Sequence, residues 1–328
     1  MAVAHLGHAE LRVTDLDRSR WFFTEVMGLY VTEENDERVY LRAWQDWDHH
    51  TLILTKADHT GIEHVGWRVE KPEDLGTYEK QFKDLGVDYH WIEGGKEPGQ
   101  GDGLRFMTPG GMPFELYWER ELYAVNGKDG LASALPSHPQ RYASRGIGPR
   151  RFDHVNFLAD EPGAEQEWLT RELGIHHRYY AENSNGERLA SWLSRTNLSH
   201  EVAIQRNKNQ TGALLHHVAY FVDSPDQMAR AATILADNGI QIEWGPGQHG
   251  TSGAIFLYCF EPSGNRVEVW TGGMLIFAPD WEPIGWGPET AELGYELWGS
   301  QMPETYLTYG TESHFTDAPQ KSASSTSG

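Results

Sequence analysis

Two similar stretches of the chain, residues 6–29 and 152–175, decide the fold. The first reads LGHAELRVTDLDRSRWFFTEVMGL and the second reads FDHVNFLADEPGAEQEWLTRELGI. Each opens with alternating apolar side chains, which predict a β-strand. Each continues with a segment of helical periodicity that has acidic residues in its first turn and closes on a glycine. A strand followed by an amphipathic helix, met twice, indicates an internal duplication.

Two further pairs of matching segments follow in the same order. IEHVGWRVEKPEDL (62–75) resembles LHHVAYFVDSPDQM (215–228), and FMTPGGMPFELYW (106–118) resembles FEPSGNRVEVWTG (260–272). Within each half the succession of strand, helix and strands repeats again at lower similarity. The sequence therefore predicts four βαβββ modules of an α+β fold, at 6–58, 62–120, 150–206 and 214–272.

The repeat also predicts the domain organisation. We expect an N-terminal domain over 1–120, a linker rich in Gly, Ser, Pro and Ala over 121–149, and a second domain over 150–272. Residues 273–315 hold many aromatic residues and prolines, and we expect them to wrap the second domain. The last residues, 316–328, have the composition of a disordered tail.

Composition argues against several classes of function. Asp and Glu number 48 against 27 Lys and Arg, which gives a net charge of −21. Such a surface repels phosphate backbones and anionic lipids, so neither a nucleic acid nor a membrane is an expected partner. We see no run of about 18 apolar residues and no signal peptide, and we expect a cytoplasmic protein. The single cysteine, Cys259, leaves the 16 histidines and the carboxylates as the expected metal ligands.

Two histidines and a glutamate recur at matching places in the two halves. They are His8, His64 and Glu115 in the first half, and His154, His217 and Glu268 in the second. Each lies within an alternating strand, where period-two geometry directs one face inward. Two neutral imidazoles and one carboxylate leave open positions on an octahedral cation. This is the donor set of non-haem Fe(II) sites that react with oxygen.

The residues around these triads differ between the halves. The second half carries three groups able to move protons: His200, His249 and Tyr258. Alignment on the two glutamates places Lys96 opposite His249 and Arg105 opposite Tyr258, whereas His50 does match His200. The first half thus keeps possible ligands but lacks two of the three proton-handling groups. We expect it to be a structural duplicate, and the sequence leaves open whether it binds metal.

Around these residues the sequence resembles the type I extradiol dioxygenases of the vicinal oxygen chelate superfamily, and in particular the catechol 2,3-dioxygenases. The resemblance covers residues 4–315 and includes, in order, WFFTEVMGL, VYLRAW, HHTLILT, GPGQHG, LYCFEPSGNRVEVW and LIFAPDWEPIGW. It implies two tandem vicinal-oxygen-chelate domains, glyoxalase- and bleomycin-resistance-like, with mixed sheets curled around a metal-site cavity. It also implies a homo-oligomer, a dimer or a tetramer.

The resemblance implies one metal in the second half and an oxygenase reaction. Fe(II), with Mn(II) as the other candidate, would be held by His154, His217 and Glu268. Three protein ligands leave three positions, enough for both hydroxyl oxygens of a catechol and for O2. The implied activity, in aromatic hydrocarbon catabolism, is extradiol cleavage of catechol or of alkyl- or halo-substituted catechols. Its products would be 2-hydroxymuconate semialdehydes.

The resemblance also assigns five residues around the metal. His200 would be the acid–base histidine, since an imidazole can give or take a proton near neutral pH. His249 and Tyr258 would bond a substrate oxygen and help to remove its proton. Asn156 and Trp192 match positions that line the pocket and would contact the substrate.

Other functions on the same scaffold stay open. A glyoxalase-like isomerase or a glutathione transferase would use a metal without needing His200, His249 and Tyr258, and a non-catalytic binding module would need no triad at all. Trp244, before His249, favours a substrate without an acidic side chain. Arg266, two residues before Glu268, keeps a carboxylated substrate possible.

Overall fold

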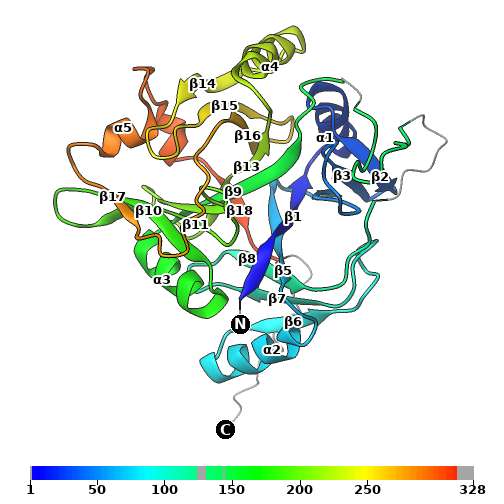
Figure 1. Cartoon of the computed structure of the whole chain (residues 1–328), viewed down its shortest axis with the longest axis horizontal. Helices are drawn as coiled ribbons and strands as arrows, with labels where there is room; N and C mark the ends of the chain where they lie inside the picture. The colour runs from blue at the N-terminus through cyan, green and yellow to red at the C-terminus, as the bar shows by residue number, and fades with distance from the viewer. Residues whose placement is uncertain (1, 124–130, 143–144, 316–328) are drawn as a thin grey trace.

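The computed structural model of the chain describes residues 2–123, 131–142 and 145–315. The strands lie at the centre of the molecule and the helices α2, α3 and α4 lie at its periphery (Figure 1). A strand, a helix and three strands follow one another four times along the chain. This order confirms the predicted fold of four βαβββ modules in two tandem vicinal-oxygen-chelate domains.

The first half contains two modules. The first consists of β1 (Val3–Val13), α1 (Leu16–Trp21), η1 (Phe22–Val26), β2 (Tyr30–Glu34), β3 (Arg38–Arg42) and β4 (Leu52–Lys56). The second consists of β5 (Gly61–Val69), α2 (Asp74–Leu85), β6 (Tyr89–Ile92), β7 (Gly103–Met107) and β8 (Pro113–Tyr117). The strands pair in the order β2-β3-β4-β1-β5-β8-β7-β6. Within this order only the pairs β4–β1 and β5–β8 are parallel. The two modules join through the antiparallel pairing of their first strands, β1 and β5.

The second half repeats this arrangement. Its third module consists of β9 (Arg151–Ala159), α3 (Pro162–Leu173), β10 (His176–Glu182), β11 (Arg188–Ser194) and β12 (Val202–Arg206). Its fourth consists of β13 (Leu214–Phe221), α4 (Pro225–Asp237), β14 (Ile242–Gln248), β15 (Ile255–Phe260) and β16 (Arg266–Thr271). The order β10-β11-β12-β9-β13-β16-β15-β14, with β12–β9 and β13–β16 parallel, matches that of the first half.

The first predicted helix differs in detail from its counterpart. The Asp15 side chain caps α1 by accepting the backbone N–H of Arg18 at 3.0 Å. After one and a half turns the helix widens into the π-helix η1, which buries Phe22, Phe23 and Val26 against the core. Gly28, at φ +86°, ends this segment, as Gly174, at φ +69°, ends α3, because glycine adopts the left-handed conformation without strain.

The segment after β16 contacts both halves. It contains β17 (Ile284–Trp286), α5 (Ala291–Tyr295), η2 (Glu304–Leu307) and β18 (Thr311–Ser313). β17 pairs with β10 of the second half. β18 lies between β13 and β5 and therefore joins the two halves (Figure 1). The exact domain boundaries stay a prediction, and the predicted tail, 316–328, with part of the predicted linker lies outside the described residues.

One continuous apolar core lies under both halves. Phe114 of β8 contacts Phe157 of β9, and Phe106 of β7 contacts Trp168 of α3, with ring centroids 6.2 and 6.0 Å apart. Cys259 is buried in this core, on the face of β15 opposite to Tyr258. Among the described residues, no helix is long and apolar enough to cross a membrane.

Candidate metal centre and active-site pocket

Three adjacent strands of the second half bring His154, His217 and Glu268 together. Ala219 of β13 lies in register with His154 of β9 on one side and with Glu268 of β16 on the other. His217 precedes Ala219 by two residues, so its side chain points to the same face. The Nε2 atoms of the two histidines are 3.2 Å apart, and each lies 3.0 Å from Oε2 of Glu268. The three side chains are buried.

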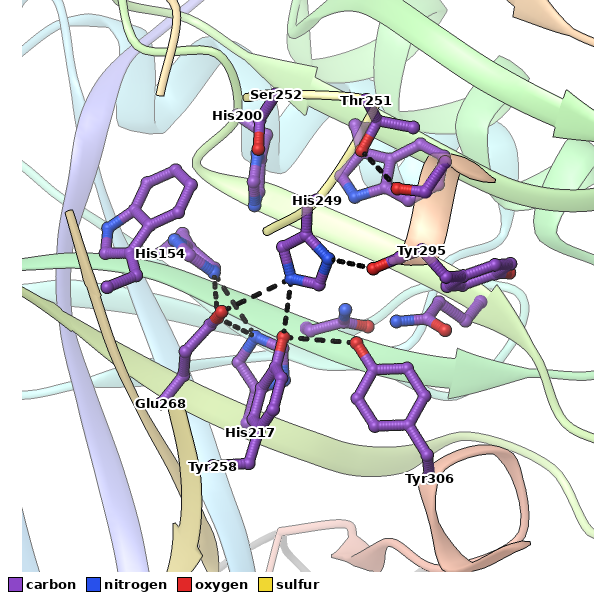
Figure 2. Close-up of a pocket in the computed structure, with 15 residues that line it drawn as sticks. His154, His200, His217, His249, Thr251, Ser252, Tyr258, Glu268, Tyr295 and Tyr306 are labelled. Carbon is purple, nitrogen blue, oxygen red and sulfur yellow. Dashed lines mark hydrogen bonds and ion pairs between the residues drawn. The ribbon is translucent and has the colours of Figure 1, made fainter. Parts of the chain in front are cut away.

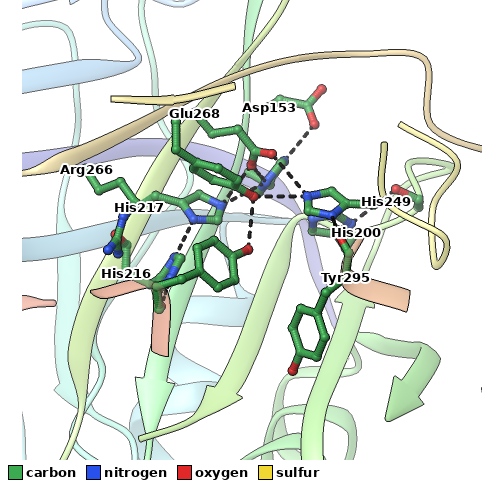
Figure 3. A network of polar contacts seen from close by, with 12 residues as sticks. Asp153, His200, His216, His217, His249, Arg266, Glu268 and Tyr295 are labelled. Carbon is green, nitrogen blue, oxygen red and sulfur yellow. Dashed lines mark hydrogen bonds and ion pairs between the residues drawn. The ribbon is translucent and has the colours of Figure 1, made fainter. Parts of the chain in front are cut away.

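The residue before each histidine determines which ring nitrogen of that histidine faces the centre. Asp153 Oδ2 lies 3.1 Å from Nδ1 of His154 and accepts its proton. His216 must donate its Nε2 proton to the carbonyl of Tyr306 at 2.6 Å, so its Nδ1 accepts from Nδ1 of His217, also at 2.6 Å (Figure 3). Both His154 and His217, when neutral, therefore present an unprotonated Nε2 to the centre, as metal-binding histidines require.

Two β-bulges make these contacts possible. The pairing of β13 with β9 slips between Leu215 and His217, so His216 is an extra residue without a partner on β9. A second slip leaves Asp153 as the extra residue of β9. Period-two alternation would place His216 on the face opposite to His217, but alternation stops at the bulge and the two rings contact each other.

The charges of the cluster suit a cation. Burial raises the pKa of Glu268, but His217 and His154 outweigh it, and the pKa lies well below the usual value. Burial opposes protonation of His154, yet hydrogen bonds to Asp153 and Glu268 raise its pKa to about 9. Burial lowers the pKa of His217 to about 4. Oε1 of Glu268 is buried without a hydrogen bond. An ionised carboxylate with a free oxygen beside two imidazole nitrogens fits a divalent metal.

A pocket with an empty volume of about 330 Å³ opens beside this cluster (Figure 2). All eight residues predicted for the site line it: His154, His217, Glu268, His200, His249, Tyr258, Asn156 and Trp192. The lining also includes residues that we did not predict: Gln205, Thr251, Ser252, Trp270, Gly294, Tyr295 and Tyr306.

His249 and Tyr258 form a directed hydrogen-bond chain. Nδ1 of His249 donates to the carbonyl of Tyr295 at 2.6 Å, so in the neutral ring Nε2 is an acceptor. The hydroxyl of Tyr258 lies 3.1 Å from this Nε2 and donates to it, and it accepts in turn from the hydroxyl of Tyr306 at 3.1 Å (Figure 2). Burial and then the charge of Glu268 raise the pKa of Tyr258 well above its usual value, so it stays a neutral phenol.

His200 lies on the other side of the pocket, with its ring centroid 4.2 Å from that of His154. Its Nδ1 lies 2.8 Å from the hydroxyl of Tyr179. Burial, and then His154, lower the pKa of His200 well below its usual value, so the ring is neutral near pH 7. Trp192 stacks on Tyr179 with centroids 5.0 Å apart, and Oδ1 of Asn156 is buried without a hydrogen-bond partner.

Some of the unpredicted residues had a signal in the sequence and others had none. Trp270 follows Glu268 by two residues, so period-two alternation places it on the same face. Tyr295 and Tyr306 belong to the segment after β16, and only the aromatic content of that segment distinguished it. Their place beside His249 and Tyr258 results from the packing of η2 and α5 on β13–β15.

Arg266 does not enter the pocket. Its guanidinium donates to Glu243 at 2.6 and 2.8 Å and to the carbonyls of His216, Tyr309 and Thr305. No lysine or arginine occurs among the lining residues that the structure describes. The described lining residues therefore offer no lysine or arginine to a carboxylate on the substrate.

The first half contains a related but different cluster. Arg105 lies in register with Glu115, as Tyr258 does with Glu268, in agreement with the alignment of the repeats. His8 and His64 approach each other as their counterparts do, with Nε2 atoms 2.8 Å apart. Glu115 is 4.0 Å from His64, and Glu97, which the sequence did not single out, comes closer.

Comparisons with known proteins agree with this fold and site. Residues 62–121 match the catechol 2,3-dioxygenase-like N-terminal domain, and residues 151–269 match the glyoxalase/bleomycin resistance protein/dioxygenase superfamily. The chain is 40% identical over 302 residues to a manganese-dependent 2,3-dihydroxybiphenyl 1,2-dioxygenase of Geobacillus genomosp. 3, covering 92% of this chain and 95% of that protein. It is 34% identical to a metapyrocatechase of Geobacillus stearothermophilus, covering 94% of each.

A solved structure shows the same fold. Homoprotocatechuate 2,3-dioxygenase from Brevibacterium fuscum, in complex with 3,4-dihydroxyphenylacetate, superimposes with a TM-score of 0.84 at 27% identity, covering 94% of this chain and 93% of that one. A divalent metal site of two histidines and a glutamate, a catecholic substrate and O2 follow from this relationship. The chain belongs to the type I extradiol dioxygenases of the vicinal oxygen chelate superfamily and is a ring-cleaving enzyme of the catechol 2,3-dioxygenase kind.

Proposed function

We propose that the enzyme cleaves catechol and alkyl- or halo-substituted catechols next to the diol, with Fe(II) held by His154, His217 and Glu268. One ring C–C bond breaks, both atoms of O2 enter the product, and catechol gives 2-hydroxymuconate semialdehyde. The observation that supports this most is the convergence of three buried donor atoms within 3.2 Å beside a pocket that His200, His249 and Tyr258 also line. When bound, the metal favours loss of the catechol protons and brings the diol and O2 together.

The chain's own residues move the protons. The Nε2 atom of His249 and the hydroxyl of Tyr258 lie next to each other, and this pair accepts a catechol proton: the Tyr258 oxygen takes it while the hydroxyl passes its own proton to Nε2 of His249. His200, neutral and buried on the opposite side, faces the place left for oxygen and donates a hydrogen bond there. Asn156 offers its unpartnered Oδ1 to a substrate hydroxyl.

The wall of the pocket supports a substrate with an uncharged side chain. Trp192 and Trp270 line it, and Arg266 is held outside by Glu243. A biaryl catechol is the second candidate, because one relative with 40% identity is named for 2,3-dihydroxybiphenyl. The name of that relative also makes Mn(II) the alternative metal.

Reconstitution distinguishes these possibilities. The chelated, metal-free enzyme is loaded without oxygen with Fe(II) or with Mn(II), and catechol, 4-methylcatechol, 4-chlorocatechol, 2,3-dihydroxybiphenyl or 3,4-dihydroxyphenylacetate is then added with O2. We expect a yellow product and one O2 consumed per catechol with Fe(II), and low turnover of the carboxylated substrate. Faster turnover with Mn(II), or with 2,3-dihydroxybiphenyl, would replace the metal or the substrate that we propose. No colour and no oxygen uptake with any combination would contradict the assignment of this site.

Two further expectations stay predictions. A homo-oligomer, either a dimer or a tetramer, would give a mass in light scattering of two or four times 37.2 kDa. A cytoplasmic location is the other, and fractionation of the producing cells would test it.

A further inference from the structure

We propose that the first half binds a second divalent transition-metal ion through His8, His64 and Glu97, and that this ion stabilises the fold rather than taking part in ring cleavage. The proposal goes beyond the oxygenase function, which needs one metal in the second half. It rests on the geometry of a buried cluster formed by β1, β5, β8 and the loop after β6.

The donor atoms of this cluster have the spacing of metal ligands. The Nε2 atoms of His8 and His64 lie 2.8 Å apart, close to the 3.2 Å of His154 and His217. Oε2 of Glu97 lies 3.5 Å from Nε2 of His8, and Oε1 lies 3.5 Å from Nε2 of His64. Ligands at right angles on a metal with bonds of about 2.1 Å are about 3 Å apart, so small shifts would close the site.

Alignment of the two halves matches Glu115 to Glu268, but in this cluster Glu97 is the carboxylate that is able to bind a metal. Arg105 donates its Nε proton to Glu115 Oε2 at 2.6 Å, and the side-chain amide of Gln100 donates to Glu115 Oε1. Both oxygens of Glu115 are thus engaged, whereas Oε2 of Glu97 is buried and accepts no hydrogen bond. The unpartnered carboxylate oxygen points at the same gap as the two imidazoles.

A neighbouring carboxylate prepares His64 for metal. Oε2 of Glu10 lies 3.0 Å from Nδ1 of His64, and its charge favours the tautomer that keeps Nε2 free, although the two atoms do not form the hydrogen bond that joins Asp153 to His154. The buried carboxylates Glu10, Glu97 and Glu115 face one buried guanidinium, Arg105, while Arg38 reaches Glu10 from the surface at 3.5 Å. When all three carboxylates are ionised and both imidazoles are neutral, these carboxylates outnumber the two guanidinium groups, and a divalent ion would offset that excess.

The same features make a catalytic role unsuitable. Arg105 stands where the second half has Tyr258, and its guanidinium binds both Glu97 and Glu115. The ring of His8 lies against Gly66, where an added Cβ would come within 2.2 Å of it. Ala219 occupies the corresponding position in the second half. Its Cβ prevents the ring of His154 from taking the place that the ring of His8 takes. The charged groups of this cluster therefore bind one another. Among its described residues, none forms a proton-handling pair like His249 and Tyr258.

Counting bound metal tests the proposal without measuring activity. All proteins carry His59→Ala, because His59, Glu312 and His314 form an exposed group that could also take metal. Metal-free protein is dialysed against micromolar zinc chloride, and zinc per chain is counted by mass spectrometry. We expect two ions in this parent, one in His154→Ala/His217→Ala, and one in His8→Ala/His64→Ala. One ion in the parent and none in His154→Ala/His217→Ala would overturn the proposal.

A conservative pair of variants covers the case in which His8→Ala/His64→Ala does not fold. In the His154→Ala/His217→Ala background, Glu97→Gln keeps the size of the side chain and should weaken zinc binding by at least about tenfold. The control is Glu63→Gln. Glu63 is a buried carboxylate of β5, the strand that carries His64, and it lies outside the donor set, so this change should leave zinc binding unchanged. Zinc should raise the melting temperature of the background and of Glu63→Gln but not of Glu97→Gln. Equal zinc binding by Glu97→Gln and Glu63→Gln would overturn the assignment of Glu97.

Discussion

The two halves of the molecule use the same strands and the same bulges but place different residues on them. At the matching bulges the extra residues are Gly7 of β1 and Glu63 of β5 in the first half, and Asp153 of β9 and His216 of β13 in the second; β1 has a further slip at Ala4. Glu63 faces Arg12, whereas Asp153 and His216 each fix the ring of the neighbouring histidine. The backbone alone therefore does not make a metal centre of the second half, because the residues at its bulges orient the ligands.

The side of the cluster away from the bulges differs even more. Arg105 pairs with Glu115 at the register position where Tyr258 lies beside Glu268. In the first half the long side chain of Arg105 lies beside Glu115 and binds it, whereas in the second half the phenol of Tyr258 lines an open pocket. The residue at this register position is thus one of the differences that separate a closed ion-pair cluster from a site open to substrate.

Removing a ligand should have the largest effect and should affect the halves unequally. His154→Ala or Glu268→Ala should reduce ring cleavage to background, because either change removes a donor of the metal. His8→Ala should leave the turnover of catechol within about twofold of wild type. Oxygen uptake at saturating catechol, with catalytic metal counted in each variant, measures this. Activity that survives His154→Ala but is lost in His8→Ala would reverse the assignment of the halves.

Removing His200, the residue that we propose as the acid–base histidine, should slow turnover without releasing metal. His200→Phe should retain stoichiometric metal and reduce kcat by about 10²- to 10⁴-fold, the usual contribution of a positioned proton donor. His50→Phe, the matched change in the first half, should leave kcat unchanged. Single-turnover kinetics after rapid mixing of the catechol-loaded enzyme with O2 would separate this effect from slow product release. An unchanged kcat in His200→Phe would remove His200 from the mechanism.

The histidine at the bulge should act on metal affinity. His216→Phe keeps an aromatic ring at this position but removes the nitrogen that accepts the Nδ1 proton of His217. The proton is then no longer held on Nδ1, so Nε2 of His217 is no longer kept unprotonated. We expect metal affinity to fall about 10- to 100-fold. The matched change, Glu63→Gln, should leave the affinity of the catalytic centre unaltered. Competition with a coloured chelator measures both. Affinity equal to wild type in His216→Phe would show that the bulge residue does not orient His217.

The smallest expected effect concerns the choice of substrate. Trp192→Phe opens space beside Tyr179 while it keeps an aromatic wall. The ratio of kcat/KM for 4-methylcatechol to that for catechol should change by about tenfold, the lower end of the range of about 10- to 200-fold that one carbon group contributes in an apolar pocket, because the aromatic wall is kept. The kcat for catechol itself should stay near wild type. A large loss of kcat with both substrates would instead give Trp192 a role in positioning His200 through Tyr179.

Much of the site could be predicted because duplication gives an internal comparison. His154, His217 and Glu268 stood out by recurring, and alignment of the halves placed Arg105 opposite Tyr258 in the register that the structure shows. Glu97 could not be found this way, because its counterpart in the second half is not a carboxylate. Tyr295 and Tyr306 could not be found either, since the segment that carries them has no repeat to compare.

The sequence by itself determined the four modules, the strand positions of the candidate ligands and the asymmetry of the halves, because period-two alternation and repetition are local properties of the chain. Only the tertiary structure decided what lies beside each ligand. His216 contacts His217 because a one-residue slip against β9 cancels the alternation. Tyr306 reaches Tyr258, 48 residues earlier in the chain, because η2 packs on β14 and β15. Slips in register and contacts between distant segments depend on which partners a strand finds, and no local pattern encodes that.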